Sequence, residues 1–192
     1  MKNLLLGFGV LFCLLYSQRS EAKASPYRLG IVIVVDQFRA DFLTRFKDRF
    51  ISSRNGVGGF KFLMDGGAYF PLADHGLFQN MTCPGHAAIL TGSYPYRNGI
   101  SMNLWYDREK KQEEYCVRDA TARLIGKDGI YGEEKNGVSP KYLNATTVGD
   151  ELKNAGLKTR VVSVSFKDRA AVMLGGKRPD LALWMSDKSC QW

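Results

Sequence analysis

The sequence lacks an apolar run long enough to span a membrane, which takes about 20 residues. Its longest apolar run, Leu4–Tyr16, is shorter than that, follows Lys2 and precedes Ala22-Lys23-Ala24. A basic residue, a short apolar segment and a small-residue site in this order are typical of a secretory signal peptide. We predict that residues 1–24 are cleaved after Ala24 and that the mature protein is periplasmic or secreted, with no stable membrane anchor.

Cysteine is scarce and has no paired spacing. The chain has four cysteines, and Cys13 lies inside the predicted signal peptide. The other three are Cys83, Cys116 and Cys190, with no C-x-x-C or other close pair, which argues against a compact cysteine zinc site and a disulfide framework. Export permits one bridge, for which Cys116 and Cys190 are the candidates, although sequence separation does not determine distance in space.

Acidic residues are outnumbered, since 27 Lys and Arg face 19 Asp and Glu, for a net charge of +8. A basic chain suits an anionic substrate. The basic residues are scattered and not interleaved with aromatic residues, so we predict a solvated surface and no nucleic-acid groove. No internal repeat or low-complexity linker divides the chain, and no feature of the sequence determines the oligomeric state.

The first half of the chain has the alternating pattern of an α/β fold. The continuously apolar run Leu29–Val35 predicts a strand buried on both faces of a parallel sheet. Phe38, Phe42, Phe46 and Phe50 recur every fourth residue after it, which predicts an amphipathic helix covering that sheet. A shorter helix is expected around residues 60–64.

Capping signals mark the later helices. A helix begins at Thr82, which we expect to be its N-cap, with Pro84 in the first turn and Gly92 as the stop. Residues 94–140 have little periodicity and predict loops or hairpins. A capping box starts a helix after Thr147. Strands are predicted at 159–165 and 181–185, with a short helix from Ala170 between them.

Four polar residues lie where predicted strands end or helices begin: Asp36, Thr82, Lys167 and Arg169. In an open α/β sheet, ligands bind at the carboxyl ends of the strands. Lys167 and Arg169 lie on one side of an extended segment, which favours an anion between them. Taken alone, Asp36 and Thr82 are more typical of caps or surface residues, and a solvated edge fits Lys167 and Arg169 equally well, but one site could gather all four.

Several motifs in order along the chain resemble those of the alkaline phosphatase superfamily, and more narrowly its threonine-nucleophile phosphate monoesterases, relatives of the type I phosphodiesterase/nucleotide pyrophosphatase family. The motifs are Asp36-Gln37-Phe38-Arg39, Asn80-Met81-Thr82-Cys83-Pro84-Gly85-His86, Thr91-Gly92-Ser93-Tyr94-Pro95, Asn98-Gly99-Ile100, Asn103 and Ser165-Phe166-Lys167-Asp168-Arg169. The resemblance implies an alkaline-phosphatase-like fold with a mostly parallel central sheet, of which residues 25–192 are the N-terminal part of a single catalytic domain.

The resemblance also implies roles for individual residues. Asp36 is expected to bind zinc, and Thr82 to be both a zinc ligand and the nucleophile that forms a phosphothreonine intermediate. Asn103, Lys167 and Arg169 are expected to hold the phosphoryl oxygens. The cofactor implied is a pair of Zn²⁺ ions, and the substrates are small-molecule phosphate monoesters. A hydroxyl is a weak nucleophile until a base or metal ion activates it, which agrees with these roles.

Three other functions share parts of this pattern. A phosphodiesterase or nucleotide pyrophosphatase on the same scaffold is the nearest, but the Lys-x-Arg pair suits the extra charge of a monoester. A non-catalytic phosphate-binding protein is the second, because a catalytic zinc normally takes three protein ligands and the chain has only two histidines. We expect instead that the sequence is an incomplete piece whose other ligands lie further along. A sulfatase is disfavoured, since Pro84 directly follows Cys83 and Ala87 stands where its motif has arginine.

Overall fold

The computed structural model describes residues 28–126, 129–131 and 137–185. The predicted signal peptide and Cys190 lie outside these residues. The chain divides into two compact units, Met1–Ile33 and Val34–Trp192. Every element below lies in the second unit, and none of the helices in the described ranges is both long and apolar enough to cross a membrane.

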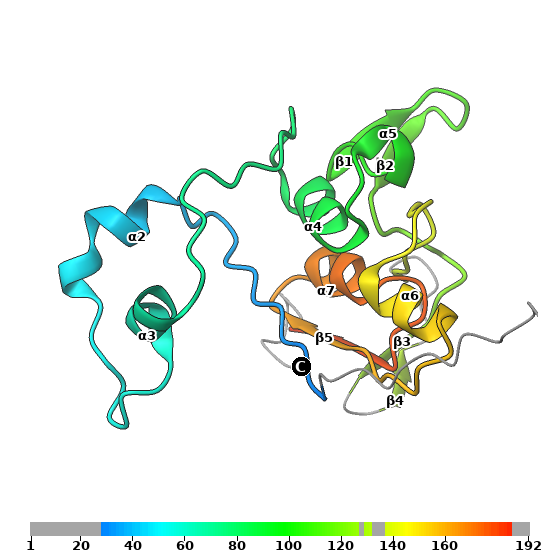
Figure 1. Ribbon diagram of the computed structural model, residues 1–192. Helices are drawn as coiled ribbons and strands as arrows, with labels where there is room; N and C mark the ends of the chain where they lie inside the picture. The colour runs from blue at the N-terminus through cyan, green and yellow to red at the C-terminus, as the bar shows by residue number, and fades with distance from the viewer. Residues whose placement is uncertain (1–27, 127–128, 132–136, 186–192) are drawn as a thin grey trace, which may run out of the picture. The chain divides into compact units, whose positions relative to one another are not determined.

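Helices make up most of the regular structure (Figure 1). They are α2 (Asp41–Arg45), the 3₁₀ helix η1 (Lys47–Arg49), α3 (Gly59–Gly66), α4 (Thr82–Thr91), α5 (Pro95–Asn98), α6 (Val148–Asn154) and α7 (Asp168–Gly175).

Short strands form three separate pairs. They are β1 (Leu104–Asp107), β2 (Gln112–Tyr115), β3 (Leu124–Gly126), β4 (Gly129–Tyr131), β5 (Val162–Ser165) and β6 (Leu181–Trp184). The β1–β2 and β3–β4 pairs are antiparallel hairpins, as expected for part of the 94–140 region, and β5–β6 is parallel. The α/β class is confirmed, and among the described residues the sheet is incomplete, with β5–β6 as its parallel part.

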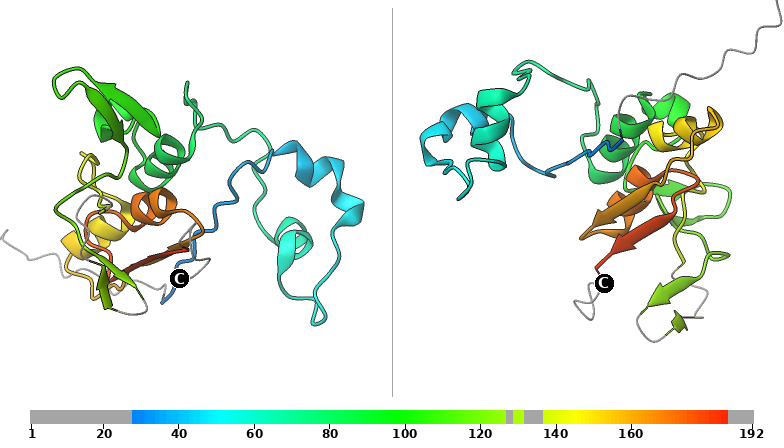
Figure 2. Two further views of the ribbon diagram at one scale, coloured as in Figure 1. Left: turned by 180° about the vertical axis from the view of Figure 1, so that it is seen from behind. Right: turned by 60° about the horizontal axis from the view of Figure 1, so that its bottom comes forward.

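The β5–α7–β6 unit positions the later site residues. Val162 is opposite Leu181 in the parallel register, and α7 packs on the strand pair (Figures 1 and 2). Helix α4 packs on α7 in turn. The buried core gathers here and below the β1–β2 hairpin, with Cys83, Ile100, Leu143 and Met173 among its members. This core fixes the N-termini of α4 and α7 near each other.

Local capping signals are well reproduced in α6 and α4. Thr147 accepts a hydrogen bond from Asp150 N while the Asp150 carboxylate accepts from Thr147 N, which is the predicted capping box. Helix α4 ends at Gly92, whose φ of 61° is a left-handed conformation that glycine adopts without strain. Both boundaries confirm the prediction from sequence.

The predicted strand at Leu29–Val35 is wrong. The segment has no strand assignment, and most of its apolar side chains are exposed, Ile31 by 72% and Ile33 by 76%. A strand requires hydrogen-bonded neighbours, and none of the strands in the described ranges pairs with this segment.

The phenylalanine stripe forms less helix than predicted. Only Asp41–Arg45 is α-helical, and η1 follows. The Phe38 ring stacks on Phe60 of α3 at 4.9 Å between centroids, and Phe50 contacts the same ring at 5.1 Å. The stripe therefore packs on α3, which forms where a short helix was expected, and not on a sheet.

Candidate active site

Thr82 is the first residue of α4 and not its N-cap, which corrects the prediction. Met81 holds the N-cap position and has no side-chain cap. The Thr82 hydroxyl instead donates to Asp36 Oδ2 at 3.2 Å. A long-range contact has replaced the local one, so the hydroxyl is aimed at a carboxylate instead of its own helix.

Asp36 joins two of the predicted residues. Its Oδ2 accepts from Thr82 Oγ1 and from Lys167 Nζ, the latter at 3.1 Å. Burial opposes the charge on Asp36, but the Lys167 ammonium and the Thr82 hydroxyl outweigh it and hold the pKa of the carboxyl below its ordinary value. An ionised carboxylate next to a hydroxyl can orient and activate that hydroxyl.

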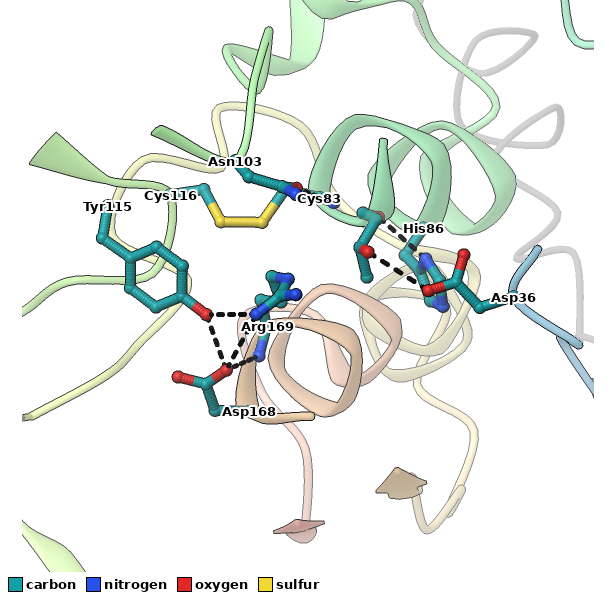
Figure 3. Close-up of a disulfide and its surroundings, with 9 residues drawn as sticks. Asp36, Cys83, His86, Asn103, Tyr115, Cys116, Asp168 and Arg169 are labelled. Carbon is teal, nitrogen blue, oxygen red and sulfur yellow. Dashed lines mark hydrogen bonds and ion pairs between the residues drawn. A yellow bond between two sulfur atoms is a disulfide. The ribbon is translucent and has the colours of Figure 1, made fainter. Parts of the chain in front are cut away.

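His86 is a neighbour that the sequence did not single out. It lies beside Asp36 (Figure 3), almost fully buried, with Nδ1 hydrogen-bonded to Thr82 O at 2.7 Å. Burial lowers the pKa of His86 below its ordinary value, although the Thr82 carbonyl and the Asp36 carboxylate oppose this effect. The spacing of four between Thr82 and His86 on a helix was the available signal.

Asn103 is held beside the start of α4. Its Oδ1 accepts from Cys83 N at 2.8 Å, so the NH₂ group of its side chain is the donor that remains for a ligand. Its backbone O accepts from Cys116 N at 3.0 Å. The residue is thereby fixed between α4 and the β1–β2 hairpin.

A disulfide joins Cys83 to Cys116, with Cα atoms 6.6 Å apart (Figure 3). The candidate pairing of Cys116 with Cys190 is therefore wrong, because Cys116 is already used. Both half-cystines are fully buried. The bridge attaches the residue after Thr82 to the end of the hairpin that carries Asn103.

Lys167 and Arg169 do not share one extended segment, contrary to the prediction. Lys167 has extended backbone at the N-cap of α7, and Arg169 is already helical. Lys167 reaches Asp36, whereas Arg169 Nη1 donates to the Tyr115 hydroxyl at 3.1 Å. The turn between strand and helix separates the two cations while keeping both within electrostatic range of His86.

The predicted residues can be tested against the needs of a metal ion. Asp36 Oδ2 and Thr82 Oγ1 are two oxygen atoms that lie close together and could both bind a metal ion. The Lys167 ammonium contacts Asp36 Oδ2, so this position favours a cation. No group of three or more His, Cys, Asp and Glu side chains within the described ranges could hold a metal. Asp36 and Thr82 thus fit as part of a ligand set, not as a whole one.

The model of the family described as type I phosphodiesterase / nucleotide pyrophosphatase matches residues 30–184. The chain belongs to this family. It is a partial chain of the alkaline phosphatase superfamily, as the sequence motifs indicated.

Named relatives agree with this membership. The chain is 39% identical over 165 residues to alkaline phosphatase PhoK of Sphingomonas sp, a match covering 84% of this chain and 27% of that protein. It is 36% identical over 188 residues to alkaline phosphatase PafA of Elizabethkingia meningoseptica, covering 97% of this chain and 33% of that one. The chain spans only about a quarter to a third of the length of these two relatives.

Solved structures agree on the fold. The crystal structure of wild-type alkaline phosphatase PafA matches with a TM-score of 0.65 and 32% identity, covering 84% of this chain and 31% of that chain. A PafA variant matches with a TM-score of 0.66 and 30% identity, covering 84% of this chain and 31% of that chain. In that variant a threonine is replaced by serine, and an asparagine, a lysine and an arginine by alanine.

Proposed function

We propose that the protein containing this chain is a phosphate monoester hydrolase of the alkaline phosphatase type. The observation that carries the proposal is the contact of the Thr82 hydroxyl with Asp36 Oδ2, beside the Lys167 ammonium. Relatives that carry the name alkaline phosphatase support the reaction class.

Thr82 is the proposed nucleophile. Its Oγ1 loses its proton and attacks phosphorus, the bond from phosphorus to the ester oxygen breaks, and the leaving oxygen takes up a proton and departs as the alcohol. Water then hydrolyses the phosphothreonine to inorganic phosphate and restores the threonine hydroxyl. Asp36 orients the hydroxyl, and the N-terminal end of α4 adds a favourable dipole for the phosphoryl group. The same four residue types altered in the PafA variant occur here in the same order as Thr82, Asn103, Lys167 and Arg169, which supports these assignments.

Asn103, Lys167 and Arg169 are proposed to bind the phosphoryl oxygens. The amide NH₂ of Asn103 is oriented by its bond to Cys83 N. Lys167 and Arg169 supply two positive charges, which match the dianion of a monoester better than the monoanion of a diester. The proposed substrates are therefore small-molecule monoesters and not nucleic acids.

Two Zn²⁺ ions are the proposed cofactor. Asp36 and Thr82 would hold one of them, with further ligands from the rest of the full-length protein, since a catalytic zinc normally takes three protein ligands. Bound zinc would stabilise the alkoxide of the nucleophile and the charge on the leaving oxygen. Lys167 would then be released from Asp36 to contact the substrate.

Export is part of the proposal. A signal peptide over residues 1–24 would deliver the protein to the periplasm or the outside of the cell. The buried Cys83–Cys116 disulfide supports this, because such bridges persist in oxidising compartments.

The test compares p-nitrophenyl phosphate with bis-p-nitrophenyl phosphate as substrates of the full-length protein. We expect a higher kcat/KM for the monoester, and a fall of about 100-fold in Lys167→Ala. Lys158→Ala is the matched control, because Lys158 is exposed. A preference for the diester would favour the phosphodiesterase that the family name includes. Saturable phosphate binding without turnover would instead identify a binding protein.

A further inference from the structure

Tyr115, Asp168 and Arg169 form a hydrogen-bonded group next to the proposed phosphate site (Figure 3). The Tyr115 hydroxyl donates to Asp168 Oδ1 at 2.6 Å and accepts from Arg169 Nη1 at 3.1 Å. Asp168 Oδ1 also accepts from Arg169 N at 2.6 Å. Tyr115 ends β2, whereas the other two residues begin α7, so the group bridges two elements that are far apart in sequence.

The direction of these hydrogen bonds follows from the chemistry of the three groups. A guanidinium only donates, so the Tyr115 oxygen must accept from Arg169, and its single proton is then left for the Asp168 carboxylate. Burial, together with Asp168, raises the pKa of Tyr115 to about 12, so the phenol keeps that proton at working pH. The tyrosine hydroxyl therefore has a fixed direction in both hydrogen bonds, as donor to Asp168 and as acceptor for Arg169.

Arg169 is only partly used by this group. Its Nη1 is bonded to Tyr115, while its Nε is buried and has no hydrogen-bond partner among the described residues. A buried donor without an acceptor is costly, and an oxyanion is the kind of ligand that accepts from a guanidinium fork. The bond to Tyr115 restrains rotation of the fork and so selects which N–H groups remain for that ligand.

We propose that Tyr115, itself oriented by Asp168, is a positioning residue that fixes the direction in which Arg169 presents its remaining N–H groups to the transferred phosphoryl group. This inference rests on the proposed function, because it acts through Arg169. Tyr115 is the last residue of the β1–β2 hairpin and directly precedes Cys116, so the disulfide holds it in place.

The test is a double-mutant cycle in the full-length protein with Tyr115→Phe and Arg169→Ala. Tyr115→Phe keeps the ring and removes only the hydroxyl. We expect its monoester kcat/KM to fall about tenfold, with a smaller loss for a diester, and no further fall when it is added to Arg169→Ala. Tyr142→Phe is the matched control, because its hydroxyl also donates to a carboxylate, that of Glu114 at 3.0 Å, and not to the group that contacts Arg169. We expect its activity to be unchanged.

Asp168→Ala provides a second variant if Tyr115→Phe does not fold. Asp168 also accepts from Arg169 N and lies 3.9 Å from Arg169 Nη1, so this variant tests the hydrogen-bonded group of three and not Tyr115 alone. We expect a loss in the same direction that also disappears in the Arg169→Ala background. Suppose that the enzyme is active and that Arg169→Ala lowers its activity. If Tyr115→Phe then causes no loss of kcat/KM, or an equal loss with and without Arg169, the positioning role is overturned and the role of Arg169 stands. If Arg169→Ala itself keeps full activity, the role proposed for Arg169 fails, and with it this inference.

Discussion

Cys83 and Cys116 are joined by a disulfide, and both of their backbone N–H groups donate to Asn103. Each half-cystine directly follows a residue with a proposed role in the site, since Cys83 follows Thr82 and Cys116 follows Tyr115. The bridge thus connects the helix of the proposed nucleophile to the hairpin that contacts Asn103 and Arg169. Its removal should affect stability and catalysis together.

We predict that replacing both cysteines by alanine lowers the free energy of unfolding by about 3 to 4 kcal/mol, because the bridge closes a loop with a sequence separation of 33. Monoester kcat/KM should fall as well, since Asn103 loses its fixed position. Thermal melting with and without a reducing agent measures the first effect. The wild type should respond to reduction and the double variant should not, and equal responses would contradict the prediction.

Much of the fold could be predicted wherever the signals were local. The α4 stop at Gly92, the Thr147–Asp150 capping box and the β5–α7–β6 order each depend on residues within a few positions of one another. Such signals survive in almost any tertiary setting. Assignment of residues 25–192 to one domain stays a prediction.

The remaining features depend on contacts between distant residues, and the sequence was wrong about several of them. The apolar residues at 29–35 predicted a strand, but they do not identify the neighbouring strand with which it would pair. Thr82 was expected to cap its own helix, yet its hydroxyl reaches Asp36 across the sequence. The partner of Cys116 and the contact of Tyr115 with Asp168 are likewise set by tertiary packing.

Four candidate site residues were found from their places at strand and helix ends, and Asn103 and the individual roles came from family motifs. In the structure, Thr82 and Lys167 each contact Asp36 directly. Asn103 and Arg169 contact the residues that flank this group, not the group itself.

We predict that Thr82→Ala lowers kcat by at least about 1000-fold, because no other hydroxyl replaces the proposed nucleophile. Thr82→Ser should keep part of the activity.

Thr91→Ala is the matched control for that variant. Thr91 ends the same helix, and its hydroxyl donates to Ala87 O within α4, away from Asp36. We expect its kcat to stay close to that of the wild type. Acid quenching with a radiolabelled monoester should trap label on the wild type and none on Thr82→Ala, and label on the alanine variant would exclude Thr82 as the nucleophile.

Asp150 is a buried carboxylate that stabilises the start of α6 and the turn after α7. Its oxygens accept from Thr147 N, Lys177 N and Arg178 N. Burial opposes ionisation, but these hydrogen bonds outweigh it and hold the pKa of Asp150 below the ordinary value of about 3.9. We predict that Asp150→Ala costs about 3 kcal/mol of stability at neutral pH.

The pH dependence follows from the lowered pKa. A carboxyl with a lower pKa in the folded state stabilises the fold fully above its unfolded pKa and loses this contribution as pH falls through the folded value. The stability gap between wild type and Asp150→Ala should therefore be constant above about pH 5 and shrink below about pH 4. Glu151→Gln, at an exposed position of the same helix, is the control and should show no such gap in melting curves.

Metal binding can be measured apart from activity. Asp36→Asn keeps the size of the side chain but removes the charge that attracts a cation, so we predict that zinc bound per full-length chain falls from about two to about one. Asp65→Asn is the matched control, because Asp65 is an exposed carboxylate paired with Lys61 on α3. Elemental analysis after dialysis gives the count. Full zinc content in Asp36→Asn would remove Asp36 from the ligand set. A separate test is chelation of the wild type. If chelation abolishes turnover and added zinc restores it, zinc is supported as the cofactor, whichever residues bind it.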